Sequence, residues 1–205
     1  MRNFMSQTLI SDKLRDSYYS VLDPIITFSI RHNANPNVIT VIGFIVAAFA
    51  AVFAGSGRFV LAGIFLLLSG WCDTIDGSIA RRSGRVSKFG ALFDSVLDRY
   101  SEMMVYFGFA YYFLRIEAYL TVLALAIGLG GSLMVSYVRA RAEGLGFQCQ
   151  VGILQRSERI LLLVFGAVIS RVLLVIAIWI IAFLSNATAI YRMIYIYQKD
   201  HERKT

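Results

Sequence analysis

The sequence from Trp71 to Asp98 reads WCDTIDGSIARRSGRVSKFGALFDSVLD and joins the ends of two long apolar runs. Aspartates occur inside both runs, Asp73 and Asp76 in the first and Asp94 and Asp98 in the second. A carboxylate inside a membrane costs several kcal/mol by insertion scales, so it is normally paired or lines a functional pathway. Some partner must therefore stabilise these four acids.

The surrounding sequence has the composition of a membrane protein. Of its 205 residues, 58% are hydrophobic and 16% are charged, and the mean hydropathy is +0.65. The apolar residues number about 119, close to the ~120 that six bilayer-crossing helices of ~20 residues use. A soluble domain and a disordered chain are both excluded, because so apolar and aromatic a chain must bury its side chains.

Six apolar runs separated by short breaks are long enough to cross a bilayer. We predict an all-α, polytopic membrane protein whose six transmembrane helices lie at Val38–Gly55, Phe59 to about Ala80, Phe89–Leu114, Ala118–Val138, Val151–Ser170 and Val172 to about Tyr191. Before them, apolar residues at helical spacing predict an amphipathic interfacial helix: Leu14, Tyr18, Leu22, Ile25 and Ile26. We expect a single membrane domain over 1–205, with an interfacial segment at 1–35, the six-helix bundle at 36–197 and a cytoplasmic tail at 198–205.

Basic residues fall mainly on one side of this topology. The net charge is +7, and all 20 Lys and Arg residues except Arg58, Arg115 and Arg171 lie on the side of the two termini and the two basic connections. By the positive-inside rule that side is cytoplasmic. We therefore expect a multi-pass protein of the cell membrane, with its acidic site facing the cytoplasm and with anionic partners that do not include nucleic acid.

The spacing of the aspartates predicts a metal site. Asp73 and Asp76 are three residues apart and Asp94 and Asp98 are four apart, so each pair lies on one helix face. Only a short connection separates the two helices, which places the pairs at similar depth. Four converging carboxylates repel one another unless divalent cations lie among them, and hard oxygen ligands suit Mg²⁺ or Mn²⁺. Two such ions are the familiar arrangement for phosphoryl transfer.

These residues also match a known signature. Eight positions at fixed spacing resemble, without departure, the motif of the CDP-alcohol phosphotransferase family: Asp73, Asp76, Gly77, Ala80, Arg81, Gly90, Asp94 and Asp98. The resemblance covers the chain from Pro36 to about Arg159. It implies a dimeric enzyme in which a metal-bound CDP-lipid, such as CDP-diacylglycerol, gives its phosphatidyl group to an alcohol and releases CMP.

The resemblance also implies roles for individual residues. Asp73, Asp76 and Asp94 would hold the metals, with Asp98 as a further ligand, as the general base for the acceptor hydroxyl, or as both. The CDP-lipid would be bound by Asp73, Gly77, Arg81, Ser87 and Gly90, and by a segment similar to the family's Pro-Asn-x-x-Thr sequence: Asn37, Val38, Ile39 and Thr40.

A second polar cluster is expected to bind the acceptor: Ser136, Arg139, Arg141, Arg156 and Arg159. Four guanidiniums and a hydroxyl beside a metal site favour a doubly charged phosphate, since Arg donates two parallel hydrogen bonds to phosphate oxygens. The runs SYVRARAE at 136–143 and QRSER at 155–159 are similar to those of prokaryotic phosphatidylinositol-phosphate synthases and their archaeal-lipid counterparts, which implies inositol 1-phosphate as acceptor. That group often has Lys where this chain has Arg139.

Other interpretations stay open. The same chemistry with glycerol 3-phosphate would suit the arginine cluster equally well. The four arginines are also compatible with simple anchoring to anionic headgroups. The acids alone would fit a secondary transporter, although the sequence has no evident inverted repeats. A catalytically silent membrane scaffold is the third class.

Overall fold

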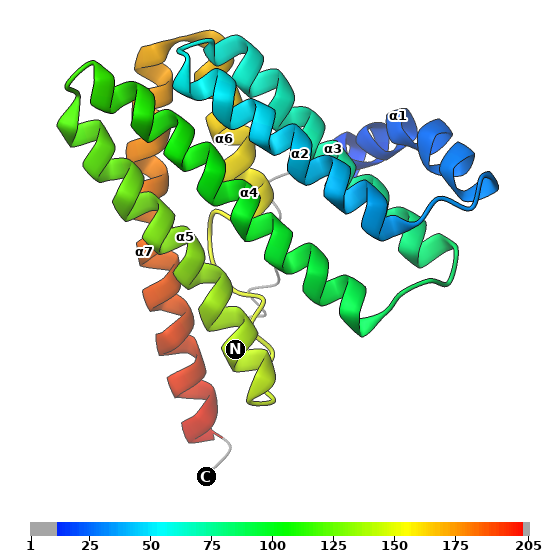
Figure 1. Cartoon of the computed structure of the whole chain (residues 1–205). Coiled ribbons are helices and arrows are strands. Elements are labelled where there is room, and N and C mark those ends of the chain that lie inside the picture. Colours follow the sequence, from blue (N-terminus) through cyan, green and yellow to red (C-terminus); the bar gives the residue numbers. More distant parts are fainter. Residues whose placement is uncertain (1–11, 203–205) are drawn as a thin grey trace. The chain divides into compact units, whose positions relative to one another are not determined.

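The computed structural model describes residues 12–202, with side chains from Val21 onward, and in this part of the chain it contains seven α-helices and no β-strand. They are α1 (Asp12–Arg31), α2 (Pro36–Gly55), α3 (Phe59–Arg82), α4 (Lys88–Arg115), α5 (Tyr119–Gly144), α6 (Arg156–Ile169) and α7 (Arg171–Glu202) (Figure 1). The all-α prediction is confirmed. The first eleven residues of the expected interfacial segment and the last three of the expected tail lie outside the described residues.

Each of the six predicted spans overlaps one helix from α2 to α7, and four of the described helices are long and apolar enough to cross a membrane: α2, α3, α5 and α7. α4 has 28 residues, but five charged side chains lie within residues 88–102: Lys88, Asp94, Asp98, Arg99 and Glu102. α6 has only 14 residues, or ~21 Å of helix, against the ~30 Å of a hydrocarbon core. The count of six spans therefore stays a prediction.

Three helix ends differ from the ends of the predicted spans. The fifth helix begins at Arg156 rather than Val151, because Gln155 and Glu158 form a capping box in which the Gln155 N–H donates to Glu158 Oε2 at 2.7 Å. α5 runs on to Gly144 and α7 to Glu202, past the predicted ends at Val138 and Tyr191. Polar residues extend both helices, since helical periodicity does not stop where hydrophobicity does.

The described residues form two compact units, 12–108 and 109–202, and α4 contributes to both. In the first unit, α2 and α3 run side by side (Figure 1) and meet where side chains are absent or small. A Cβ on Gly43 would lie 2.9 Å from Cys72 Cβ, and one on Gly108 of α4 would lie 2.3 Å from the Ala51 carbonyl oxygen. Larger residues there would force the helices apart.

α1 packs on α3 in the same unit. Leu22 and Ile26 are fully buried in a cluster with Ile75 and Ile79, while Val21, Ile25 and Phe28 stay exposed. Two of the residues expected to face lipid, Leu22 and Ile26, therefore contact protein, because α3 presents an apolar face to them. The side chains of Leu14 and Tyr18 lie outside the described part of α1.

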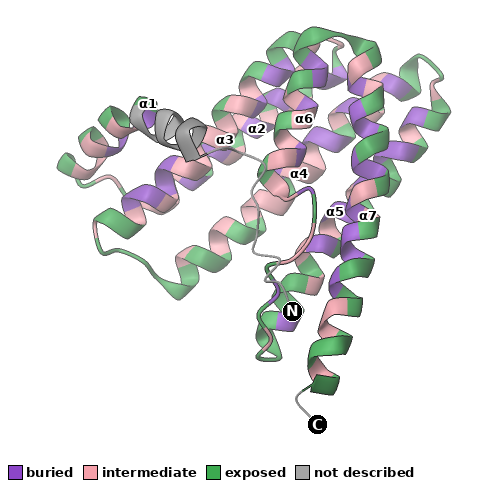
Figure 2. Ribbon diagram, turned by 180° about the vertical axis from the view of Figure 1, so that it is seen from behind, coloured by how far each residue is buried: buried purple, intermediate pink, exposed green. Residues whose placement is uncertain are grey.

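In the second unit, α5 and α7 run side by side and parallel, and α6 packs on α7 (Figure 1). Buried and exposed positions alternate along each helix (Figure 2). The Asn186 side chain of α7 donates to the Ile127 carbonyl of α5 at 3.1 Å, and it fits only because Gly131 lacks a side chain. Gly166 gives α7 a similar close approach to α6 at Leu174.

Candidate functional site

Three aspartates form a carboxylate cluster in the first unit. One oxygen each of Asp73, Asp94 and Asp98 lies within 4.8 Å of the others, and all three residues are half-buried. Asp94 and Asp98 share a face of α4, and the connection of residues 83–87 brings Asp73 of α3 opposite them. Three carboxylates this close repel one another, and their hard oxygen donors fit a divalent cation such as Mg²⁺ or Mn²⁺.

Asp76, the fourth predicted ligand, is held differently. It is 4% exposed, and its Oδ2 accepts a hydrogen bond of 2.7 Å from the Thr40 hydroxyl of α2. The same hydroxyl lies 3.1 Å from the Pro36 carbonyl oxygen, so two acceptors share its single proton. Thr40 occupies one oxygen of Asp76, and Oδ1 is the oxygen that this residue can offer to a cation.

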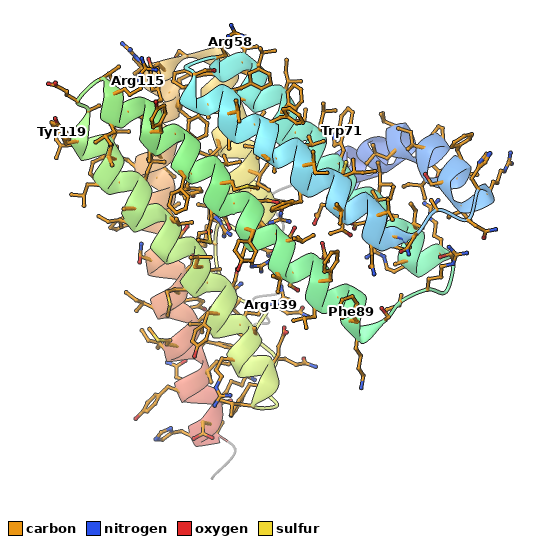
Figure 3. The ribbon with its side chains drawn as sticks, in the orientation of Figure 1. Arg58, Trp71, Phe89, Arg115, Tyr119 and Arg139 are labelled. Atoms are coloured by element: carbon orange, nitrogen blue, oxygen red, sulfur yellow. The ribbon has the colours of Figure 1, made fainter. Side chains whose placement is uncertain are left out.

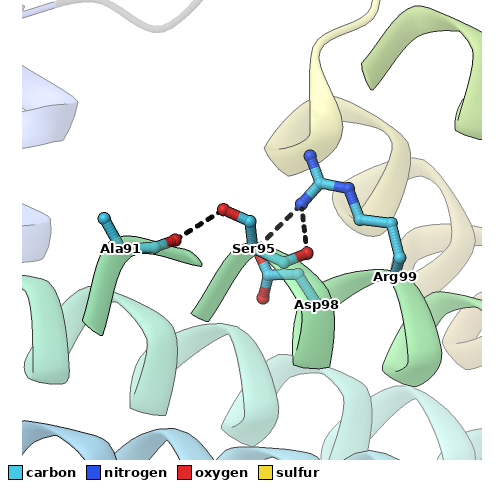
Figure 4. A network of polar contacts seen from close by, with 4 residues as sticks. All are labelled: Ala91, Ser95, Asp98 and Arg99. Carbon is cyan, nitrogen blue, oxygen red and sulfur yellow. Dashed lines mark hydrogen bonds and ion pairs between the residues drawn. The ribbon is translucent and has the colours of Figure 1, made fainter. Parts of the chain in front are cut away.

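Asp98 has a cationic neighbour on its own helix. Arg99 Nη1 lies 3.3 Å from Asp98 Oδ2 and donates to the Ser95 carbonyl at 3.1 Å (Figure 4). The Ser95 hydroxyl in turn donates to the Ala91 carbonyl at 2.6 Å. The side chain of Asp98 is 14% exposed and that of Arg99 is 32% exposed, so the carboxylate is the less accessible member of the pair.

The residues expected to bind the CDP-lipid fall into two groups. Asn37, Ser87 and Gly90 meet where α2 and α4 begin, since a Cβ on Gly90 would lie 2.9 Å from Ser87 Oγ and 3.3 Å from Asn37 Oδ1. Ser87 caps α4 by accepting from the Gly90 N–H at 2.9 Å.

The residues of the second group have different surroundings from one another. Arg81 folds over Gly77, with Nη1 at 3.1 Å from where a Cβ would be. Val38 is 54% exposed, whereas Ile39 packs on the Leu22 cluster. Ile39 therefore packs against the core, and the polar side chains of this segment are those of Asn37 and Thr40.

Two arginines that were expected only to orient the chain in the membrane, Arg82 and Arg85, contact segments far away in the sequence. Arg82 pairs with Asp23 of α1 at 2.5 Å. Arg85 donates to the carbonyls of Asn33 and Ala34 at 3.1 and 3.2 Å and to Asn33 Oδ1 at 2.7 Å. Arg85 holds the α1–α2 turn against the α3–α4 connection, which carries Ser87, and Arg82 joins the end of α3 to α1. Their partners lie 51 to 59 residues away, so no local pattern signals these contacts.

The predicted acceptor residues lie in the second unit and differ in burial. Arg139 is exposed on the last turns of α5 (Figure 3) and pairs with Glu143 at 2.9 Å, and Arg141 is also exposed. Arg156 and Ser136 are half-buried. Arg159 is only 1% exposed and donates to the Leu154 carbonyl at 3.0 Å. Arg115 and Tyr119 lie at the opposite end of α5 from Arg139 (Figure 3).

From the sequence, Arg192 was expected only to place the C-terminal end of the chain on the cytoplasmic side. In the structure it is buried. It is 4% exposed, with Nε donating to the Val151 carbonyl at 2.8 Å and Nη1 to the Val135 carbonyl at 2.6 Å. It also lies within electrostatic range of Arg139 and Arg159. The one signal in the sequence was a single Arg within an otherwise apolar and aromatic stretch of α7.

Comparison with known proteins identifies a family for the chain. The sequence model of the family described as CDP-alcohol phosphatidyltransferase matches residues 33–196. The chain is 38% identical over 165 residues to the archaetidylinositol phosphate synthase of Methanothermobacter thermautotrophicus, covering 78% of this chain and 82% of the relative.

Two solved structures of the Mycobacterium tuberculosis phosphatidylinositol phosphate synthase are similar. The one with CDP-DAG bound superimposes with a TM-score of 0.77 at 27% identity, covering 83% of this chain and 90% of the other. The complex with manganese and citrate gives 0.79 at 26% identity, covering 85% and 88%.

Proposed function

Since the chain belongs to the CDP-alcohol phosphatidyltransferase family, we propose that it is the enzyme that transfers a phosphatidyl group from CDP-diacylglycerol, or a related CDP-lipid, to inositol 1-phosphate. The products are phosphatidylinositol phosphate and CMP. The observation that carries the proposal is the cluster of Asp73, Asp94 and Asp98, whose oxygens lie within 4.8 Å of one another and could together hold a divalent cation. The names of the similar proteins support the inositol phosphate acceptor.

The aspartates are proposed to hold two Mg²⁺ or Mn²⁺ ions, with Asp73, Asp94 and Asp98 as one group and Asp76 contributing the oxygen that Thr40 leaves available. When bound, such ions supply positive charge against the diphosphate of the substrate and the leaving oxygen of CMP. The manganese complex of a similar protein supports this choice of metal.

Asp98 is the residue we assign to proton transfer. Its carboxylate accepts the proton of the inositol 1-phosphate hydroxyl, whose oxygen then bonds to the phosphorus that carries the lipid, and the bond from that phosphorus to CMP breaks. Arg99 Nη1, 3.3 Å from Asp98 Oδ2, keeps one oxygen engaged and so orients the other.

The CDP moiety is proposed to lie against Asn37, Gly77, Arg81, Ser87 and Gly90. Gly77 and Gly90 let phosphate or ribose approach the helix backbones closely, and the exposed guanidinium of Arg81 is available to a phosphate oxygen. A similar protein with CDP-DAG bound supports the identity of this ligand.

The phosphate of the acceptor is proposed to bind Ser136, Arg139, Arg141, Arg156 and Arg159. Arg139 and Arg141 are exposed and so accessible to a soluble anion, while Arg156 and Arg159 begin α6, where backbone N–H groups also favour negative charge. We further propose six spans, a homodimer, and a site facing the cytoplasm of the cell membrane, which the lopsided distribution of Lys and Arg supports.

The test is a CMP-release assay with CDP-diacylglycerol and each acceptor in turn. We expect release only with Mg²⁺ or Mn²⁺ present, strong stimulation by inositol 1-phosphate, and little by free inositol. Stimulation by glycerol 3-phosphate instead would identify that compound as the acceptor of the same transfer reaction. A protein that released no CMP under any of these conditions would not carry out the proposed reaction.

A further inference from the structure

The backbone between α5 and α6 is held by side chains from the helices around it. Residues Val151 to Leu154 belong to no helix, yet three of their carbonyl oxygens accept side-chain hydrogen bonds. Arg192 donates to Val151 at 2.8 Å, Thr188 to Ile153 at 2.6 Å, and Arg159 to Leu154 at 3.0 Å. The contact to Leu154 is buried and the other two are partly buried, and together these three hydrogen bonds fix the path of the segment.

Two residues of this segment have positive φ angles, a conformation that needs support from surrounding contacts. Gly152 has φ +123°, and a Cβ there would lie 2.5 Å from Thr188 Cγ2. Leu154 has φ +65°, a left-handed conformation that a residue with a side chain adopts rarely and at an energetic cost. Surrounding contacts must over-determine such a geometry for it to persist.

Thr188 and Arg192 are four residues apart on α7 and therefore share one face. Both donate hydrogen bonds to the same segment. Arg192 Nη1 also donates to the Val135 carbonyl of α5 at 2.6 Å, next to Ser136. The segment ends at Gln155, the residue that caps α6, and Arg156 follows at once. Any shift of this backbone would move the first turn of α6 and its arginines.

We propose that Thr188 and Arg192 are positioning residues for the acceptor-binding arginines. Their hydrogen bonds to Val151 and Ile153 form a clamp on the segment Val151–Leu154. This clamp sets where α6 begins, and therefore how Arg156 and Arg159 present their guanidiniums to an anionic acceptor. The inference rests on the proposed function for the identity of that acceptor. It predicts that loosening the clamp weakens acceptor binding and leaves CDP-lipid binding, which uses the other unit, unchanged.

Cys149 provides a reporter that is independent of catalysis. It is fully buried just before the clamped segment, and burial raises the pKa of its thiol, so it should react slowly with maleimide while the clamp holds. The sequence has one other cysteine, Cys72, which can be replaced by Ala because its Cβ, the atom that packs near Gly43, is retained.

The experiment compares Thr188→Val, Thr188→Ser and Gly152→Ala in a Cys72→Ala background. Thr188→Val keeps the shape of the side chain and removes the donor to Ile153, whereas Thr188→Ser restores that donor. Thr121→Val is the matched control, because Thr121 is a buried threonine near the opposite end of α5. Cys149 labelling and the KM values for inositol 1-phosphate and CDP-diacylglycerol are measured for each protein.

We expect Thr188→Val to raise the KM for inositol 1-phosphate and the Cys149 labelling rate each about tenfold, the cost of losing one partly buried hydrogen bond to a carbonyl. The KM for CDP-diacylglycerol and kcat should stay within about twofold. Gly152→Ala should act in the same direction, Thr188→Ser should recover most of the loss, and Thr121→Val should match the parent.

The inference would be overturned if Thr188→Val and Gly152→Ala left both the acceptor KM and the labelling rate unchanged. A rise in the CDP-diacylglycerol KM of the same size as the acceptor effect would also overturn it, since that indicates general damage. Failure of the proposed function is distinguishable, because the parent enzyme would then show no stimulation by inositol 1-phosphate while Cys149 labelling would still respond to Thr188→Val.

Discussion

The two units handle buried charge in opposite ways. In residues 12–108, Asp73, Asp94 and Asp98 gather with their oxygens within 4.8 Å of one another, so like charges face like charges. In residues 109–202, the buried guanidiniums of Arg159 and Arg192 are bonded to backbone carbonyls. The first arrangement offers three carboxylate oxygens that could hold a cation, with Arg99 beside Asp98, whereas in the second the hydrogen-bond partners are backbone carbonyls of the chain. The acids are therefore poised for a ligand, and the two buried arginines are held in place by the backbone around them.

The strongest test of this contrast removes one charge from the acidic cluster. Asp98→Asn keeps the size of the side chain but cannot accept a proton from the acceptor hydroxyl. We expect CMP release to fall about 10³-fold, the usual contribution of a positioned general base combined with a metal ligand. An unchanged circular dichroism spectrum would show that the fold is intact. Activity within tenfold of the parent would remove Asp98 from the chemistry.

Thr40 tests whether the cluster depends on its supporting hydrogen bond. Thr40→Val removes the 2.7 Å contact to Asp76 Oδ2 while keeping the side-chain shape. Partners of this kind typically change metal affinity by roughly 10- to 100-fold, so we expect Mn²⁺ affinity, measured by titration, to weaken by that range. Thr40→Ser should bind Mn²⁺ like the parent. Equal affinities in all three proteins would mean that Asp76 needs no such support.

Substitutions of the arginines in the second unit should change the unfolding free energy by amounts that depend on how buried each arginine is. Arg159→Gln removes a 1%-exposed guanidinium and leaves the Leu154 carbonyl short of a donor, so unfolding free energy should drop by about 1–3 kcal/mol. Arg139→Gln breaks only an exposed pair with Glu143 and should change stability by no more than about 0.5 kcal/mol. Thermal unfolding with and without inositol 1-phosphate measures both. Similar losses of unfolding free energy in the two variants would contradict this difference between the buried and the exposed arginine.

The smallest effect is expected at the contact between Arg82 and Asp23. Both side chains are about half exposed, so the pair is worth at most about 1 kcal/mol in a double-mutant cycle with Arg82→Gln and Asp23→Asn. The cycle is measured by thermal unfolding at low and high salt. A coupling above about 2 kcal/mol that persisted in high salt would show that the α1 contact is more than a surface ion pair.

Much of the acidic site was predictable from sequence, because helix geometry fixes the spacing of its members. Asp94 and Asp98 share a face wherever their helix lies, and a short connection can only bring Asp73 opposite them. The bond between Thr40 and Asp76 was not predictable, since it depends on side-chain conformations across 36 residues of sequence.

The basic site was harder to predict, because its geometry depends on irregular backbone. Hydrophobicity placed the fifth helix at Val151, but the conformations of Gly152 and Leu154 delay its start to Arg156. Arg192 lies in an apolar stretch with nothing beside it to indicate burial. Its partners, Val135 and Val151, are 57 and 41 residues away, so only the packed fold defines its role.

The most direct test of the account is mass spectrometry of the lipid formed from CDP-diacylglycerol and inositol 1-phosphate with Mn²⁺. We predict one lipid with the mass of phosphatidylinositol phosphate, formed in equal amount to CMP and absent when the metal is chelated. Phosphatidic acid as the only product, or CMP released without the predicted lipid, would contradict transfer to the inositol phosphate.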